Sequence, residues 1–137
     1  MTSRRYSRVS IQKSKNSDYA RVAESFYHGA ELAKEFEYWN AAGVLIVHAA
    51  IAYADAITIK FGGVKSKGED HMAVIDLLRN VTVLDEQGNR GMRHLERIIN
   101  EKNRVSYQGE MYTKKNIDSL WKHLVRYQIW AVSMIED

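Results

Sequence analysis

The sequence predicts an all-α protein, an antiparallel (up-and-down) helical bundle of about five helices with a four-helix-bundle core. Three observations lead to this fold. Apolar residues recur at spacings of three and four along most of the chain, the period of an amphipathic helix. The chain contains no proline, which would interrupt long helices. No segment alternates apolar and polar residues as a half-buried strand does, and 137 residues suit one domain with a single core.

Two segments are expected. Residues 1–16 form a basic, flexible N-terminal tail, and residues 17–137 form the helical domain. The whole chain has a net charge of +3, from 20 basic and 17 acidic residues. Five basic residues and no acidic residue lie in the tail, so the domain keeps 15 basic and 17 acidic residues and a charge of −2. The tail could contact phosphates, but we favour a solvated terminus.

The first helix is predicted to begin at Ser17 and Asp18, because a small polar residue caps a helix and an acid suits its positive end. Apolar residues then follow at helical spacing as far as Phe36. The second helix, residues 41–61, is apolar on nearly every side, as expected of a central helix. Gly62 and its following glycine should end this helix by adopting a left-handed conformation.

The second helix is also long enough to cross a membrane. His48, Asp55 and Lys60 lie within it, however, and the chain has no second apolar segment of that length. Ionisable residues are costly inside a bilayer, so we expect a core helix and no membrane association.

Three more helices are predicted in the second half of the chain. Ser66 and Glu69 have the spacing of a capping box that begins a short third helix. An irregular connector over residues 81–88 leads to a fourth helix, which ends near Gly109. Thr113 is expected to cap the fifth helix. Short connections between these helices favour antiparallel neighbours in a bundle.

Several kinds of chemistry are excluded by composition. Without cysteine, the chain has no disulfide, thiolate nucleophile or cysteine-based zinc site. No serine lies in a nucleophile elbow, and the glycines lack the spacing of a phosphate-binding loop. No apolar run follows the early arginines, so we expect no secretory signal in these residues. We expect a cytoplasmic protein with no cofactor, and we interpret His94 and His123 as surface or partly packed residues.

A polar cluster is predicted from three residues. His48 and Asp55 lie seven residues apart, two turns along one face of the second helix, and His71 lies at the start of the third. We interpret His48, Asp55 and His71 as a structural polar cluster that determines how the second and third helices dock. A His-Asp-His metal site is the alternative, because these ligands suit zinc or iron. The usual His-x-x-His or Glu-x-x-His spacing is missing, so we expect no metal.

The segment that ends the fourth helix combines a cation, an amide and a phenol. Lys102 continues the apolar stripe of this helix, so its side chain should point inward or toward a partner. Lys102, Asn103, Arg104 and Tyr107 could together surround a phosphate, and they are our candidate nucleic-acid- or nucleotide-binding residues. The alternative is ordinary helix-end chemistry, in which basic groups complement the helix dipole and tyrosine packs with its hydroxyl satisfied.

From about Asp18 to Ile135, the chain resembles the HEPN superfamily of helical domains (higher eukaryotes and prokaryotes nucleotide-binding). Five segments carry the resemblance in order along the sequence: Phe26-Tyr27-His28-Gly29-Ala30, Tyr38-Trp39-Asn40-Ala41-Ala42, the alanine-rich residues 49–56, Lys67-Gly68-Glu69-Asp70-His71, and Lys102-Asn103-Arg104-Val105-Ser106-Tyr107. Active members of this family resemble metal-independent ribonucleases, with an arginine, commonly an asparagine next to it, and a histidine a few residues further on. The resemblance implies a homodimer that brings two such motifs together in a basic cleft.

In this sequence Lys102 matches the arginine, Asn103 the asparagine and Tyr107 the histidine of that motif. Lysine keeps the charge but loses the planar fork that fits phosphate. Tyrosine has a reference pKa of about 10 and is a poor general base at neutral pH. The resemblance therefore assigns Lys102 and Tyr107 to the catalytic positions, and it implies weak or lost ribonuclease activity.

Three functions follow from the resemblance. The first is a HEPN-like homodimer that binds RNA or a nucleotide near Lys102 and Tyr107. The second is a protein-interaction module, one half of a toxin–antitoxin pair with a nucleotidyltransferase antitoxin as partner. The third is an active ribonuclease in which Tyr107 or a nearby group replaces the histidine.

Overall fold

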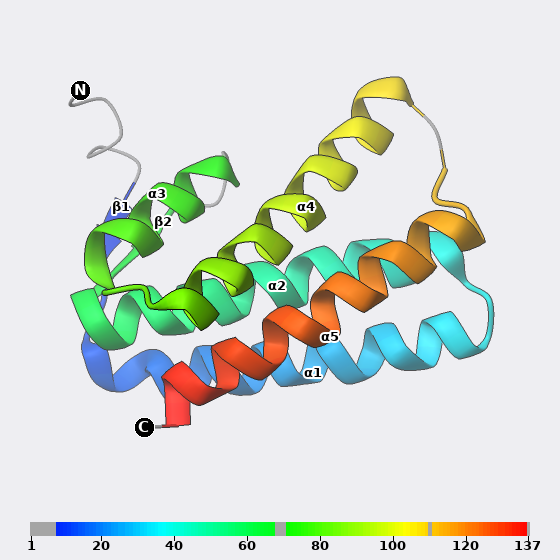
Figure 1. Ribbon diagram of the computed structural model, residues 1–137. Coiled ribbons are helices and arrows are strands. Elements are labelled where there is room, and N and C mark those ends of the chain that lie inside the picture. Colours follow the sequence, from blue (N-terminus) through cyan, green and yellow to red (C-terminus); the bar gives the residue numbers. More distant parts are fainter. Residues whose placement is uncertain (1–7, 68–70, 110, 137) are drawn as a thin grey trace.

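The computed structural model describes residues 8–67, 71–109 and 111–136, and it confirms an all-α helical bundle (Figure 1). A two-stranded sheet and a short 3-10 helix accompany the five helices of the described chain. In chain order the elements are β1 (Arg8–Ser10), η2 (Lys13–Lys15), α1 (Asn16–Glu35), α2 (Trp39–Gly62), β2 (Val64–Ser66), α3 (Met72–Val81), α4 (Glu86–Gln108) and α5 (Lys114–Glu136).

Helix α2 is the centre of the bundle. It contacts α1, α3, α4 and α5, and Figure 1 shows α4 and α5 running side by side, inclined to the α1–α2 pair. Of its most apolar 18-residue window, 78% is buried inside the protein, although the helix has the length and composition of a membrane span. Its alanines from Ala42 onward are buried against the rest of the bundle, as expected of a helix that is apolar on nearly every side.

Long-range hydrogen bonds attach α5 to α2. The buried Tyr127 hydroxyl donates to the Ala50 carbonyl oxygen at 2.8 Å. At the end of α2, Lys60 Nζ donates to the carbonyl oxygens of Met134 and Ile135 at 2.9 and 2.8 Å. These carbonyls belong to the last turn of α5, where no further helical N–H follows to bind them, so a cation there is stabilising.

Several predicted helix ends are confirmed. Helix α2 ends at Gly62, and Gly63 is left-handed with φ of 65°. Thr113 caps α5, since its Oγ1 accepts a hydrogen bond from the Asn116 backbone N–H at 3.1 Å. The predicted connector is shorter than expected, because Asp85 accepts a bond from the Gly88 N–H at 2.8 Å and α4 begins at Glu86.

The structure differs from the expected flexible tail over residues 8–16. Residues 8–10 pair antiparallel with residues 64–66, the Ile11 N–H donates to the Gly63 carbonyl oxygen at 2.8 Å, and α1 already begins at Asn16. Three-residue strands are too short to show a period of two, so the sequence pattern could not indicate them. The first seven residues of the tail lie outside the described residues.

The start of the third helix also differs from the capping-box prediction. Ser66 ends strand β2, and α3 begins only at Met72. Backbone pairing with β1 makes Ser66 part of the strand, six residues before Met72, so its side chain is too far along the chain to cap the first turn of α3. Glu69, the other half of the predicted capping box, lies outside the described residues.

Candidate functional site

The segment predicted to bind phosphate lies in the last turns of α4. Lys102 is half-buried, whereas Asn103 and Arg104 are exposed. Tyr107 belongs to the helix, but its side chain lies outside the described residues. Lys102 is thus neither buried nor fully exposed, and Asn103 and Arg104 face outward beside it.

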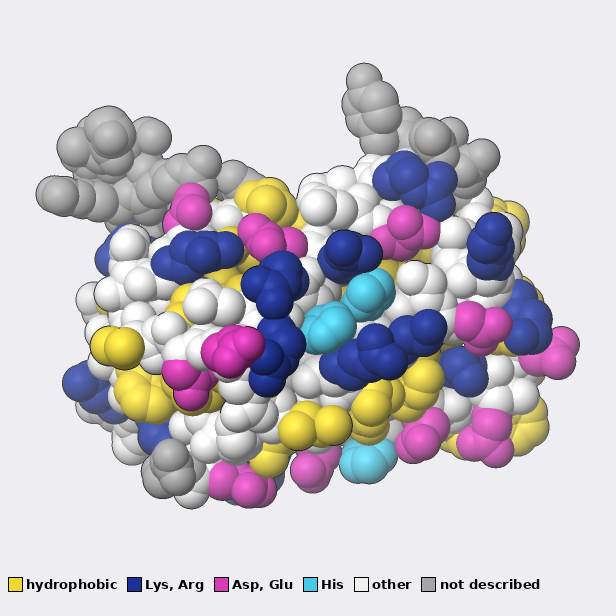
Figure 2. All heavy atoms as spheres, viewed as in Figure 1, with side chains coloured by type: hydrophobic (Ala, Val, Ile, Leu, Met, Phe, Trp, Pro, Cys, Tyr) yellow, Lys and Arg dark blue, Asp and Glu magenta, His cyan; other side chains and the backbone are white. Residues whose placement is uncertain are grey.

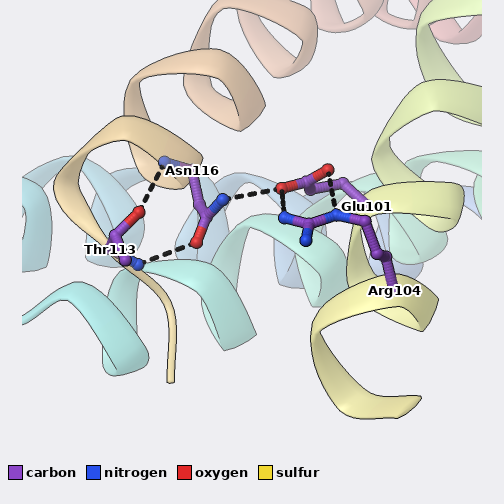
Figure 3. Close-up of polar contacts among 4 residues, drawn as sticks. All are labelled: Glu101, Arg104, Thr113 and Asn116. Atoms are coloured by element: carbon purple, nitrogen blue, oxygen red, sulfur yellow. Dashed lines mark hydrogen bonds and ion pairs between the residues drawn. The ribbon is translucent and has the colours of Figure 1, made fainter. Parts of the chain in front are cut away.

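Arg104 takes part in a hydrogen-bond network that joins the end of α4 to the start of α5 (Figure 3). Its Nη2 lies 2.7 Å from Glu101 Oε2, and the same carboxylate oxygen accepts a hydrogen bond from Asn116 Nδ2 at 2.8 Å. Asn116 Oδ1 accepts a further bond from the Thr113 N–H at 2.9 Å. The Glu101 carboxylate therefore offsets the charge of Arg104 and links it to the cap of α5.

A histidine pair lies on α4 and α5, two to three turns from this network. His94 Nδ1 and His123 Nδ1 are 2.9 Å apart, and their ring centroids are separated by 5.2 Å. Both side chains are half-buried. One ring donates its Nδ1 proton and the other accepts it, because two protonated Nδ1 atoms at this distance would repel each other.

Four cations surround the histidine pair. They are Arg93 and Arg97 on α4, and Lys122 and Arg126 on α5, and all four are exposed. Figure 2 shows histidine side chains at the centre of this face with lysine and arginine side chains around them. Together with His94 and His123, these four residues form what we call the α4–α5 basic surface.

The charges of this surface act on the histidines. Burial lowers the pKa of His94, and the positive charges of Arg126, Arg97 and Arg93 lower it further. The pKa of His123 is lowered by burial first, then by His94 and the surrounding cations. Both effects disfavour imidazolium, so the pair is neutral at pH 7 while the cations around it remain charged.

A shallow groove of about 510 Å³ extends this surface along α4 as far as Arg104. Its two carboxylates already have partners: Glu96 lies 3.6 Å from Arg79, and Glu101 binds Arg104. Within the described chain, four cationic side chains make neither a salt bridge nor a hydrogen bond: Arg93, Arg97, Lys122 and Arg126. The groove therefore presents a net positive charge.

The sequence contained a signal for this surface. Arg93 and Arg97 lie four residues apart, as do Lys122 and Arg126, and each pair encloses a histidine. Such spacing places two cations on one face of each helix. What the sequence could not give is the register in which α4 packs beside α5 (Figure 1), which brings the two rows together.

The predicted polar cluster lines a cavity. His48 and Asp55 from α2 and His71, which precedes α3, all border one cavity of about 280 Å³ between α1, α2 and β2. Lys65 of β2 borders it as well. His48 is exposed, His71 is half-buried and Asp55 is buried, with 8% of its surface exposed.

Asp55 is a buried acid with an oxygen atom that has no hydrogen-bond partner in the part of the chain that the structure describes. Its Oδ1 is buried and makes no hydrogen bond with any described residue. Burial raises the pKa of Asp55 to about 7, and the charge of Lys65 partly offsets this rise. No group of three histidine, aspartate or glutamate side chains in the described chain has the geometry of a metal site, so His48, Asp55 and His71 border the cavity without converging on one point.

Comparisons with known proteins found no relative of this chain. No family model matches it, and neither a curated protein nor a solved structure is similar to it. Its function must therefore be inferred from the fold and from the two sites described above.

Proposed function

We propose that this protein binds single-stranded RNA on the α4–α5 basic surface. The observation that carries the proposal is the group of four cations, Arg93, Arg97, Lys122 and Arg126, without an acidic partner in the described chain. Phosphate contacts with lysine and arginine supply most of the affinity in nucleic-acid binding. Cations that are not paired within the protein are available for such contacts.

The arrangement of the surface suits a strand of nucleic acid. Two rows of cations on neighbouring helices flank the seam where α4 and α5 meet, so a strand in this seam would have positive charge on both sides. Imidazole rings and guanidinium planes stack on unpaired bases, and single-stranded RNA exposes its bases for such stacking. The half-buried His94 and His123 are fixed by their mutual hydrogen bond at the middle of the seam.

The resemblance of the sequence to the HEPN superfamily supports the same function, because it implies binding of RNA or a nucleotide by this helix. The position of the site implied by the resemblance differs from that of the α4–α5 basic surface. The resemblance points to Lys102–Tyr107, where Arg104 already binds Glu101, whereas the four cations of the α4–α5 basic surface lie nearer the middle of the two helices. A homodimer, a weak or lost ribonuclease activity and a cytoplasmic location are the further parts of this proposal.

The test measures binding of a fluorescent single-stranded RNA by anisotropy at several salt concentrations. Replacing Arg93, Arg97 and Arg126 by glutamine should weaken binding at least about tenfold. It should also reduce the slope of log K against log salt by about 2, since each lost phosphate contact removes about 0.7 on a single strand. The control variant replaces the exposed Lys13, Lys15 and Lys115 by glutamine, which removes the same charge elsewhere.

Two outcomes would reject the proposal. One is that the wild-type protein fails to bind RNA at low salt. The other is that both triple variants lose the same affinity, which would show a dependence on net charge alone. In the same assay Lys102→Ala and Tyr107→Phe, scored for binding and for cleavage of the RNA, test the position implied by the resemblance.

A further inference from the structure

The cavity beside Asp55 is lined by α1, α2, β2 and His71, and it shares no residue with the α4–α5 basic surface. Its walls come from α1 and α2, where Val22, Phe26, Val47 and Ile51 supply apolar surface. The charged and imidazole side chains that line it are His48, Asp55, Lys65 and His71. At about 280 Å³ it is close to the lower end of the range of small-molecule sites.

The buried carboxylate of Asp55 has an oxygen atom that lacks a hydrogen-bond donor in the described chain. Its Oδ1 is shielded from solvent and has no donor in the described chain, although the side chain borders an open cavity. Native proteins leave very few buried polar atoms unsatisfied, and each exception asks for an explanation. A donor on a ligand in the cavity would satisfy this oxygen, and a charged donor would do so most strongly.

The cavity is also bordered by a cationic side chain, Lys65, which forms no salt bridge with Asp55. Lys65 acts on the Asp55 charge, but no salt bridge within 4.0 Å joins the two side chains, and Lys65 Nζ donates to the Ser66 carbonyl oxygen at 2.9 Å. An ammonium has three donors, so Lys65 can bind an acceptor in addition. The cavity thus offers an acceptor, a separate donor and an apolar wall.

We propose that this cavity binds a free α-amino acid with an apolar or aromatic side chain. The ligand's ammonium group would donate to Asp55, its carboxylate would accept from Lys65, and its side chain would pack against Phe26, Val22 and Ile51. A simple amine would offer Lys65 no acceptor beyond the Ser66 carbonyl oxygen, and a simple carboxylic acid would place two carboxylates near each other. Only a molecule with both groups satisfies both ends of the cavity.

Calorimetric titration at pH 8, where Asp55 is ionised, tests the proposal with L-phenylalanine and L-leucine as probes. Phenethylamine, which lacks the carboxylate, and 3-phenylpropionate, which lacks the ammonium group, are the matched comparisons. At least one amino acid should bind, and the corresponding analogue should bind about tenfold or more weakly, because each charged hydrogen bond that is lost costs that much. Equal or tighter binding of either analogue would overturn the proposal.

Protein variants identify the cavity as the site. Asp55→Asn and Lys65→Met should each weaken amino-acid binding about tenfold or more. Val22→Phe should abolish it by filling the cavity from α1 while leaving both charged groups in place. Val44→Phe, at an exposed position of α2 that does not border the cavity, is the control for added bulk. No binding by wild type, or unchanged binding by Asp55→Asn and Val22→Phe, would reject the site without affecting the proposed binding of RNA.

Discussion

At the scale of single residues, burial affects the ionisable side chains in two opposite ways. It raises the pKa of Asp55, an acid, and lowers the pKa of His94 and His123, which are bases. In each case the neutral form is favoured, because the protein solvates charge less well than water does. The effect is largest at Asp55, where no hydrogen bond to Oδ1 compensates for the lost water.

The raised pKa of Asp55 predicts a dependence of stability on pH. Below about pH 4 the carboxyl group is protonated in the folded and unfolded chains alike. Between pH 4 and pH 7 the unfolded chain releases the proton while the folded protein keeps it, so the free energy of unfolding falls as pH rises. A shift of this size corresponds to at most about 4 kcal/mol. Above pH 7 both states are ionised and the loss ends.

Urea denaturation at steps from pH 4 to pH 8 measures this loss. Asp55→Asn removes the ionisable group, so the variant should gain stability relative to wild type as pH rises through this range. Asp118→Asn is the control, because Asp118 is an exposed carboxylate paired with Lys114 at 2.9 Å. A fall in stability that is equally steep in Asp55→Asn and in wild type would contradict the assignment.

At the scale of helices, glycines determine how closely α4 approaches α5. An ideal Cβ built on Gly91 of α4 would lie 2.6 Å from Cε3 of the Trp130 ring on α5. Gly29 of α1 differs, since its Cβ would meet only Leu45 Cδ1, at an ordinary contact distance of 3.5 Å. The two glycines therefore predict opposite results on substitution.

We expect Gly91→Ala to lower the free energy of unfolding by about 1–3 kcal/mol, because the added methyl group overpacks the contact with Trp130. Gly29→Ala should raise it by about 0.5–1 kcal/mol, because alanine favours a helix interior over glycine. Thermal unfolding followed by circular dichroism compares the two variants. A Gly91→Ala protein as stable as wild type would show that α4 and α5 are less closely packed than described.

The elements also show which features a sequence can predict. The end of α2 at Gly62 and the start of α5 after Thr113 depend on neighbouring residues, and both were predicted correctly. The His94–His123 pair joins residues 29 positions apart and depends on the register in which α4 packs against α5, which periodicity does not determine. For the same reason the sequence placed His48, Asp55 and His71 in a common cluster but gave no indication of the cavity that they border.

At the scale of the whole molecule, the β1–β2 pair ties the chain before α1 to the connection after α2. It thereby joins the two ends of the α1–α2 hairpin, whose helices form the most extensive helix–helix contact in the bundle. Ile11 continues this pairing through its N–H, which donates to the Gly63 carbonyl oxygen. The pairing places Lys65 at the edge of the cavity.

Ile11→Pro should remove this hydrogen bond and lower the free energy of unfolding by about 1–3 kcal/mol, since proline has no N–H and constrains the backbone. Ile11→Val keeps the N–H and most of the side chain, so it should cost less than about 1.5 kcal/mol. Hydrogen exchange at the amides of residues 63–66 should quicken in the proline variant alone. Equal exchange in both variants would show that the strand pair contributes little to the closure.

The first and last elements of the described chain, β1 and α5, both contact the chain near the end of α2. Residues 8–10 pair with the segment after α2, and the last turn of α5 receives hydrogen bonds from Lys60 near the end of α2. Any domain or label joined before Arg8 or after Glu136 would therefore emerge from one pole of the molecule. The opposite pole, where Thr113 and Asn116 turn the chain from α4 into α5, would stay unobstructed, and this makes it the natural position at which to open a circularly permuted chain.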